Sequence, residues 1–401
     1  MKKNILFVMN NLTCGGAEKA LISLLETIDY AKFNVDLLLF KQEGLFLSQI
    51  PPEVNLLAEP CGYKYFDMSI KTAIKDCIQK GQFDIVFSRL KAGYIFRTEE
   101  NKAICEQKVW KCLSNILQSI QKEYDVAIGY LEKSPVYFSI EKVNAKKKIG
   151  FIHNDYNKLG MDPKIDEYYF SKLDNILTVS EECARVLRSK FPQYKNKVDV
   201  MYNIVSPAVL NKLSTEKIDI VKSGVTLVSV GRLTQQKGFE LAVKACKNLV
   251  KNGYDVKWYV IGEGEERVTL ERLIIENDLL ENFILLGLKE NPYPYIKAAD
   301  IYVQPSRFEG KSIAIDEAKI LNKPIVVTNF STVTDQISNN QNGLIVEMNP
   351  KAIAGGIKRL IDNVSIRNSL KENLLKEELG TESEIQKLYD LFRVGQKGIN
   401  K

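Results

Sequence analysis

Short apolar runs alternate with helical patterns along all 401 residues, and this alternation limits the fold more than any other feature. Apolar runs of this length between helices are typical of parallel strands that helices cover on both faces. The pattern therefore predicts an α/β fold with doubly wound parallel sheets. The predicted strands are Ile5–Met9, Val35–Phe40, Asp84–Phe87, Val126–Gly129, Lys148–Ile152, Ile176–Val179 and Val198–Met201, then Thr226–Val230, Lys257–Ile261, Phe283–Leu286, Ile301–Val303, Ile325–Val327 and Gly343–Val346.

The alternation breaks between Tyr202 and Ser223, where a polar and charged stretch that includes Pro207 predicts a linker. A chain of 401 residues is long enough for two domains, each with its own core. We therefore expect two Rossmann-like halves that face a ligand cleft. The predicted domains are residues 1–203 and 204–375, and a terminal segment, 376–401, follows with apolar residues at helical spacing.

The composition is that of a globular protein, with 45% hydrophobic and 26% charged residues. The net charge of +6 is spread along the chain, so the sequence gives no sign of nucleic-acid binding. A local basic excess does occur around Lys146–Lys148. It has two interpretations, either a solvated loop before a strand or a contact with an anionic membrane surface.

Seven cysteines are scattered along the chain, without any Cys-x-x-Cys pair. They are typical of the reduced thiols of a cytosolic protein and predict neither a disulfide framework nor a zinc site. No apolar run reaches the length of about 18 residues that a membrane-spanning helix needs. The N-terminal run Ile5–Met9 is too short for a signal peptide and predicts a first strand.

Two carboxylates lie close together near the start of a helical pattern in the second half of the chain. Glu309 stands in a loop, and Glu317 follows eight residues later, inside the helix. At 1.5 Å per helical residue, the two acids lie roughly 12 Å apart or less. The helix N-terminus between them offers unpaired N–H groups to an anion. A sugar ester of a nucleoside diphosphate has this layout, because a hydroxyl-rich ring lies on either side of its pyrophosphate.

Glycine turns follow two earlier strands of the same half. The first turn starts at Gly231 and carries Arg232 and Lys237, whose positive charges can clamp a diphosphate. The second turn, 262–264, reads Gly-Glu-Gly, and its glycines allow the backbone to approach a ligand closely. Ligands of open α/β sheets bind at the carboxyl ends of the strands, where both turns are expected.

The first half contains two further candidate features. Gly15 and Gly16 form a strand-to-helix turn, which either approaches a ligand or is a tight turn without one. His153 is the single histidine of the chain and follows a predicted strand. A lone histidine is more often structural, but its place at the end of a strand favours a binding site.

Three motifs, taken together, resemble those of the retaining glycosyltransferases of family 4 (group 1). They are Gly-Arg-Leu at 231–233 with Gln-Lys-Gly at 236–238, Gly-Glu-Gly at 262–264, and Pro-Ser at 305–306 with Glu-Gly at 309–310 and Glu-Ala at 317–318. Residues 309–318 and 322–326 are similar to those of members that build bacterial capsular and extracellular polysaccharides. The chain departs from many relatives at Lys311-Ser312, where these have an aromatic residue and then Gly or Pro.

The resemblance implies a GT-B fold, in which the first domain binds the acceptor, the second domain binds the nucleotide sugar, and a C-terminal helix returns to the first domain. It also implies the site residues. The catalytic set is Arg232, Lys237, Glu309 and His153, and the donor-binding set is Gly15, Gly16, Gly262, Glu263, Gly264, Leu288, Gly310, Lys311, Ser312, Ile313 and Glu317.

The reaction implied is transfer of a hexose or N-acetylhexosamine from a nucleotide-diphosphate sugar, UDP-linked, with retention at the anomeric carbon. Arg232, Lys237 and the helix N-terminus near Ser312 would stabilise the leaving pyrophosphate, and Glu309 would position the sugar. No Asp-x-Asp motif occurs, so neither a metal nor another cofactor is expected. The implied acceptor is a glycan linked to polyprenyl diphosphate, which places the protein in the cytoplasm, in peripheral contact with the inner membrane face.

Two other functions stay open at this point. A nucleotide-sugar epimerase or a hydrolase could use the same fold, because fold does not determine function. Such an enzyme would need an acid or base in the first domain, where His153 is the histidine candidate. A non-catalytic partner of a transferase is the other alternative. It is disfavoured by the presence of Arg232, Lys237, Glu309 and Glu317 together.

Overall fold

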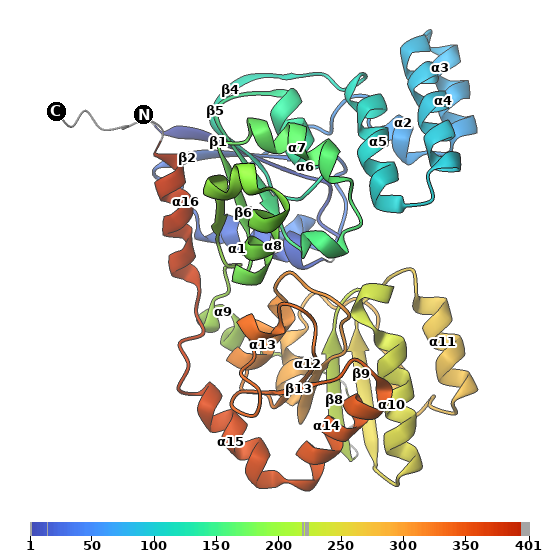
Figure 1. Ribbon diagram of the computed structural model, residues 1–401, viewed down its shortest axis with the longest axis vertical. Helices are drawn as coiled ribbons and strands as arrows, with labels where there is room; N and C mark the ends of the chain where they lie inside the picture. Colours follow the sequence, from blue (N-terminus) through green and yellow to red (C-terminus); the bar gives the residue numbers. More distant parts are fainter. Residues whose placement is uncertain (1, 14, 219, 221–223, 394–401) are drawn as a thin grey trace, which may run out of the picture. The chain divides into compact units, whose positions relative to one another are not determined.

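The computed structural model describes residues 2–13, 15–218, 220 and 224–393, which form two compact units (Figure 1). The first unit comprises Met1–Thr13, Ala17–Tyr202 and Glu384–Lys401, and the second comprises Cys14–Gly16 and Asn203–Ser383. Each unit is built around one parallel sheet with helical crossovers. The predicted α/β class with two doubly wound parallel sheets is thus confirmed.

The sheet of the first unit has seven strands in the order β3-β2-β1-β4-β5-β6-β7. Strand β1 lies inside this sheet and is almost fully buried, and Ile5 pairs with Val35 on one side and Val126 on the other. Such burial requires the continuous apolar run seen in the sequence. The strands are β1 (Lys3–Met9), β2 (Phe33–Leu39), β3 (Asn55–Leu56), β4 (Ile120–Gly129), β5 (Val143–Ile152), β6 (Asn175–Thr178) and β7 (Val198–Val200).

The sheet of the second unit has six strands in the order β10-β9-β8-β11-β12-β13. The strand order reverses between β8 and β11, and ligands of open α/β sheets bind at the carboxyl edge beside such a reversal. The strands are β8 (Val225–Val230), β9 (Val256–Ile261), β10 (Phe283–Leu285), β11 (Ile301–Gln304), β12 (Ile325–Thr328) and β13 (Leu344–Val346).

Helices connect the strands of both units. In the first half of the chain they are α1 (Gly16–Thr27), α2 (Lys64–Asp67), α3 (Ile70–Gln79), α4 (Phe83–Thr98), α5 (Lys102–Ser114), α6 (Ser134–Glu141), α7 (Pro163–Lys172) and α8 (Glu181–Lys190). Those that follow are α9 (Pro207–Leu213), α10 (Phe239–Lys251), α11 (Arg267–Glu276), α12 (Tyr293–Ala298), α13 (Ile313–Ile320), α14 (Pro350–Asp362), α15 (Val364–Leu374) and α16 (Ile385–Phe392). Short 3-10 helices are η1 (Leu47–Gln49), η2 (Tyr156–Lys158), η3 (Pro192–Lys197), η4 (Gln235–Lys237), η5 (Val333–Asp335) and η6 (Glu382–Glu384).

Each unit has its own hydrophobic core. In the first unit, Phe40, Trp110 and Phe138 pack together between the sheet and its helices, with ring centroids 5.4–6.5 Å apart. In the second unit, Trp258 of β9 packs against Phe283 of β10 at 5.4 Å. Burying side chains of this size supplies the main stabilisation of each unit.

Most of the predicted strands are present, but two local predictions were wrong. Asp84–Phe87 is not a strand, because it lies in α4, which packs between α3 and α5. Lys146–Lys148 is not a loop before a strand, because these residues lie inside β5. Lys146 pairs with Asp125 of β4, and Lys148 donates to the carbonyl of Ile140, so two of the three lysines are engaged within the unit. The segment 202–223, predicted as a linker, contains the helix α9.

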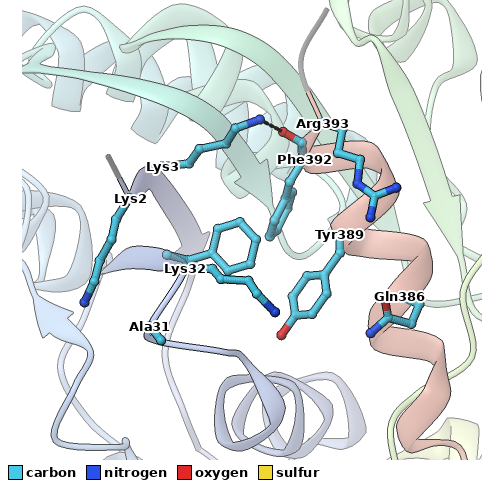
Figure 2. A pocket seen from close by; sticks show the side chains of 9 residues that line it. Lys2, Lys3, Ala31, Lys32, Gln386, Tyr389, Phe392 and Arg393 are labelled. Carbon is cyan, nitrogen blue, oxygen red and sulfur yellow. Dashed lines mark hydrogen bonds between the residues drawn. The ribbon is translucent and has the colours of Figure 1, made fainter. Parts of the chain in front are cut away.

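The last helix, α16, packs against the start of β1 and β2 in the first unit (Figure 2). Phe33 stacks with Tyr389 and Phe392 at centroid distances of 5.0 and 5.2 Å. The ammonium group of Lys3 donates to the carbonyl of Phe392 at 2.7 Å, and the amide of Asp29 donates to the Tyr389 hydroxyl at 2.7 Å. A cavity of about 680 Å³ beside these rings is also lined by Lys2, Lys32 and Arg393. None of the described helices is long and apolar enough to cross a membrane.

The contact between α16 and β2 can be tested by truncating one ring. Phe392 is 1% exposed, so Phe392→Ala should lower the free energy of unfolding by about 3–4 kcal/mol, as is typical of a large-to-small change in a core. Arg393→Ala is the control, because the Arg393 side chain is 78% exposed. Urea unfolding of both variants measures the difference. Equal stabilities would contradict a packing role for α16.

Candidate active site

The three loops singled out in the sequence all leave the carboxyl edge of the second sheet. They follow β8, β9 and β11, which lie next to one another in the order β9-β8-β11. Gly238 has a φ of +65°, and a Cβ there would stand 2.2 Å from the carbonyl oxygen of Pro305. A Cβ on Gly262 would stand 2.0 Å from the carbonyl oxygen of Gly231. Glycine is therefore needed at both positions, because the loops pack backbone against backbone.

Glu309 lies at the centre of this edge and is 5% exposed. Its Oε1 accepts hydrogen bonds from Lys237 Nζ at 2.6 Å, Ser306 Oγ at 2.6 Å and Gln304 Nε2 at 3.2 Å. Among the residues that the structure describes, no donor reaches Oε2. One carboxylate oxygen is thus held by three donors, which leaves the other free to accept a hydrogen bond from a ligand.

The two predicted cations differ in their surroundings. Lys237 forms an ion pair with Glu309, and its side chain is 15% exposed. Arg232 is exposed, and within the described ranges it has no acidic partner. Lys237 therefore has its charge balanced before any ligand is bound, whereas Arg232 is an unbalanced cation at the same loop. Arg307 stabilises the contact between the two loops, since it donates to the carbonyl of Gln235 and pairs with Glu240.

The N-terminus of α13 is held by Gln336, a residue that the sequence did not indicate. The Ser312 amide donates to Gln336 Oε1 at 2.8 Å, and Gln336 Nε2 donates to the Ser312 carbonyl and to Asp316 Oδ1, both at 2.8 Å. Lys311 pairs with Asp316 at 2.6 Å. Gly310 directly precedes Lys311 in the chain. The helix begins at Ile313, and its first N–H groups lack intrahelical acceptors. The positive end of the helix dipole thus lies just after Glu309 in the chain.

Glu317 lies inside α13 and is 2% exposed. The hydroxyl of Tyr293 donates to its Oε1 at 3.3 Å. Burial raises the pKa of Tyr302 on β11 well above its ordinary value, and the charges of Glu317 and Glu309 raise it further. The Tyr302 hydroxyl also donates to Gln304, which in turn donates to Glu309. Tyr302 is thus hydrogen-bonded into the network around Glu309, and the charge of Glu317 also acts on it.

The Gly-Glu-Gly turn lies beside the loop after β10. The Gly262 amide donates to the Gly287 carbonyl at 3.0 Å, and Glu263 pairs with Arg267 of α11. Gly264 packs its backbone against Leu233. Leu288, which follows Gly287, is 42% exposed. An exposed apolar side chain beside a glycine turn is a suitable surface for a planar ring.

His153 follows β5 in the first unit and is 8% exposed. Its amide donates to Glu132 at 3.1 Å, and its ring donates to the backbone of Tyr130. Nε2 is buried without a hydrogen-bond partner, so the donor to Tyr130 is Nδ1–H and Nε2 is an acceptor. Burial lowers the pKa of His153 to about 4, which keeps the imidazole neutral near pH 7. A buried acceptor without a partner is costly and is typical of a site that binds a donor from outside.

Gly15 lies between β1 and α1, and Gly16 is the first residue of that helix. The structure joins Lys237 and Glu309 in one network with Gln304 and Ser306, and it separately places Gln336 at the N-terminus of α13. Gln304 has a signal in the sequence, since it is a polar residue at the end of an apolar strand. Gln336 has none. No group of three metal-ligating side chains that could hold an ion is found in the described part of the chain.

Comparison with known proteins gives a family match for the second half of the chain. Residues 212–377 match the family model described as "Glycosyl transferases group 1". The capsular polysaccharide biosynthesis glycosyltransferase CapM of Staphylococcus aureus is 31% identical over 169 residues, which cover 41% of this chain and 43% of that protein. An N-acetylgalactosaminyltransferase of Campylobacter jejuni, whose name includes a diphospho-undecaprenol acceptor, is 27% identical over 55% of this chain and 60% of its own length. The chain spans about half the length of the curated relatives it matches.

Solved structures resemble the whole chain. Staphylococcus aureus TarM, in a complex that contains UDP, has a TM-score of 0.67 at 14% identity and covers 98% of this chain and 100% of its own. A glycosyltransferase from Rickettsia africae has a TM-score of 0.66 at 17% identity, with 98% of each chain covered. The fold is therefore GT-B. Residues 212–377 match the group 1 glycosyltransferase family, and this match covers the second half of the chain.

The state of His153 predicts a pH dependence of stability. Its pKa is about 4 in the folded protein and about 6.5 in an unfolded chain. Between these values the unfolded state binds a proton that the folded state does not. The free energy of unfolding should therefore fall as the pH drops from about 6.5 to about 4, by up to roughly 3 kcal/mol from this residue.

Urea unfolding at about pH 7 and about pH 4.5 measures this loss. His153→Gln has no titrating ring, so it should lose less stability than the wild type over the same interval. Parallel losses in the two proteins would contradict a neutral, buried imidazole.

Proposed function

We propose that this protein is a retaining glycosyltransferase that transfers a hexose or N-acetylhexosamine from a UDP-sugar to a hydroxyl of a growing glycan. The observation that carries the proposal is Glu309, whose Oε1 is held by three donors while no described donor reaches Oε2, and which stands in the chain just before the N-terminus of α13. That arrangement offers a hydrogen-bond acceptor for a sugar hydroxyl next to a binding site for phosphate. The UDP found in the TarM complex supports the same donor class.

In the proposed complex, the second unit holds the donor. Arg232 and the first amides of α13 bind the diphosphate, and Lys237 contacts it while it keeps its bond to Glu309. Glu317 accepts hydrogen bonds from the ribose hydroxyls. The uracil lies against Leu288 and the Gly262–Gly264 turn. The remaining donor-binding residues, Gly15, Gly16, Glu263, Gly310, Lys311, Ser312 and Ile313, shape the loops around the phosphates and the sugar.

The proposed reaction breaks the bond between the anomeric carbon and the diphosphate oxygen. The acceptor hydroxyl forms the new bond on the same face, and its proton passes to the departing phosphate oxygen. Arg232, Lys237 and the helix N-terminus stabilise the negative charge that develops there, and no metal takes part. Glu309 orients the sugar without attacking it. His153 accepts a hydrogen bond from a sugar hydroxyl through Nε2, and its low pKa suits binding better than general acid catalysis.

The acceptor and the place of action are proposed from the relatives. The Campylobacter jejuni enzyme is named for an acceptor linked to diphospho-undecaprenol, and CapM is named for capsular polysaccharide biosynthesis. We therefore propose a glycan linked to polyprenyl diphosphate as the acceptor, in bacterial surface polysaccharide synthesis. The first domain, 1–203, would bind this acceptor, the second, 204–375, would bind the donor, and 376–401 would pack on the first. The protein would act in the cytoplasm, at the inner membrane face.

Removal of the phosphate-binding cations should abolish most of the transfer. Arg232→Ala and Lys237→Ala should each lower kcat/KM by about 10²–10³-fold, because each removes a group that stabilises the leaving diphosphate. Arg272→Ala is the control, because its side chain on α11 is 72% exposed and lies outside the three motifs. Transfer of radiolabelled sugar to a glycan acceptor is measured with and without EDTA. Near-normal transfer by both variants would refute the clamp, and loss of activity in EDTA would refute metal independence.

Binding of the nucleotide can be measured without any acceptor. UDP at about a hundred times its dissociation constant should stabilise the protein by about 2.7 kcal/mol, which thermal unfolding detects. Glu317→Ala should reduce this stabilisation through loss of the ribose contact. Product analysis by NMR then separates the alternatives, since a lengthened glycan with a retained anomeric configuration is expected. Free sugar or an epimerised nucleotide sugar would contradict the proposal.

A further inference from the structure

Helix α4 of the first unit has two apolar faces, and only one of them is used by the fold. On its inner face, Ile85 and Val86 pack toward α3, while Ala92 and Ile95 pack toward α5. The close approach of α3 is evident at Gly93, where a Cβ would stand 2.6 Å from the Ile70 side chain. The inner face alone therefore anchors α4 to α3 and α5, and the outer face takes no part in this packing.

The outer face of α4 carries a row of large apolar side chains. Phe83, Phe87, Leu90 and Tyr94 are 66%, 72%, 52% and 69% exposed. Their spacing of i, i+4, i+7 and i+11 places them along one side of the helix, opposite Ala92, which is fully buried. We call these four residues the α4 stripe. Single exposed apolar residues are ordinary, but an aligned row of them marks an interaction surface.

Unbalanced positive charge surrounds the α4 stripe. Lys91 and Arg97 lie on α4 and Lys71 and Lys75 on α3, all exposed and, within the described ranges, without an acidic partner. The acid of α3, Asp76, already pairs with Lys80, so Asp84 is the one acid on these two helices that is not in an ion pair. An apolar row with a cationic border is the pattern of a helix that lies in the interface of an anionic bilayer.

The position of the pair α3–α4 within the first unit agrees with such a role. The two helices lie at the margin of that unit, and α5 connects them to the rest through α6 (Figure 1). Neither α3 nor α4 packs closely against the strand ends that carry the site residues of the first unit. The surface is thus an addition to the doubly wound sheet, and the sheet would be complete without it.

We propose that α3 and α4 dock this protein on an anionic lipid bilayer. The α4 stripe enters the boundary between headgroups and acyl chains, and Lys71, Lys75, Lys91 and Arg97 contact lipid phosphates. A second copy of the chain is a poorer occupant, because a two-fold contact through this face would bring the same unpaired cations together. The proposal rests on this surface alone and needs no sugar transfer, so it can fail or hold independently of the proposed enzymatic function.

Sedimentation with lipid vesicles tests the proposal on the full chain. The wild type should bind vesicles of mixed phosphatidylglycerol and phosphatidylcholine at least tenfold more tightly than vesicles of phosphatidylcholine alone. The variant F83S/F87S/L90S should lose at least tenfold in binding to the mixed vesicles. The control I275S/L280S should bind as the wild type does, since Ile275 and Leu280 are equally exposed (59% and 66%) but lie in the second unit.

A fluorescent variant gives a readout that does not require removal of the surface. Trp110 and Trp258 are buried and supply a constant background. In Phe87→Trp, the new indole should be solvent-exposed in buffer, and its emission should shift to shorter wavelength when anionic vesicles are added. An unchanged spectrum, or vesicle binding that the triple variant retains, would overturn the proposal. So would a wild-type dimer in lipid-free buffer that the triple variant converts to a monomer.

Discussion

A buried carboxylate organises the carboxyl edge of the second sheet. Glu309 is 5% exposed, and an unpaired charge at such a depth would cost several kcal/mol. Lys237 comes from the loop after β8, whereas Gln304 and Ser306 come from the end of β11, and all three donate to the same oxygen. The charge thus ties two neighbouring loops together. Because all three donors bind Oε1, they hold the loops together and leave Oε2 able to accept a hydrogen bond from a ligand. The ion pair between Lys237 and Glu309 is therefore compatible with ligand binding by the same carboxylate.

In the first unit, His153 is buried as a neutral group with an unpaired nitrogen, whereas Glu309 is buried as a charge that three donors stabilise. Here the ring is buried and kept neutral, and one of its nitrogens is left without a partner. An unsatisfied buried acceptor costs about 1–3 kcal/mol. An aliphatic side chain in this position would leave no unpaired nitrogen, so the folded protein would be more stable with it. Retention of such a group agrees with the proposed role of His153 in binding a sugar hydroxyl, and the same burial explains its low pKa.

Helix α4 shows how a local pattern can mislead. Asp84–Phe87 was predicted as a strand because Ile85, Val86 and Phe87, with β-branched and aromatic side chains, look like a short apolar run. The structure places Ile85 and Val86 against α3, while Phe87 is 72% exposed. A helix is recognised in a sequence by apolar residues that recur about every 3.6 positions among polar ones. When both faces of a helix are apolar, this alternation is absent. The prediction therefore failed at the element whose outer face we assign to the membrane.

The sequence by itself determined the α/β class, most of the strands and the loops that carry the motifs, because strand and helix periodicity and glycine turns are local properties. Arg232, Glu309 and Glu317 could be named from spacing and resemblance alone. Only the tertiary structure decided that Lys237 pairs with Glu309, that Gln336 holds the N-terminus of α13, and that Lys146–Lys148 lie inside a strand. These outcomes depend on residues distant in the chain, whose meeting is set by the packing of the sheet and which no local pattern encodes.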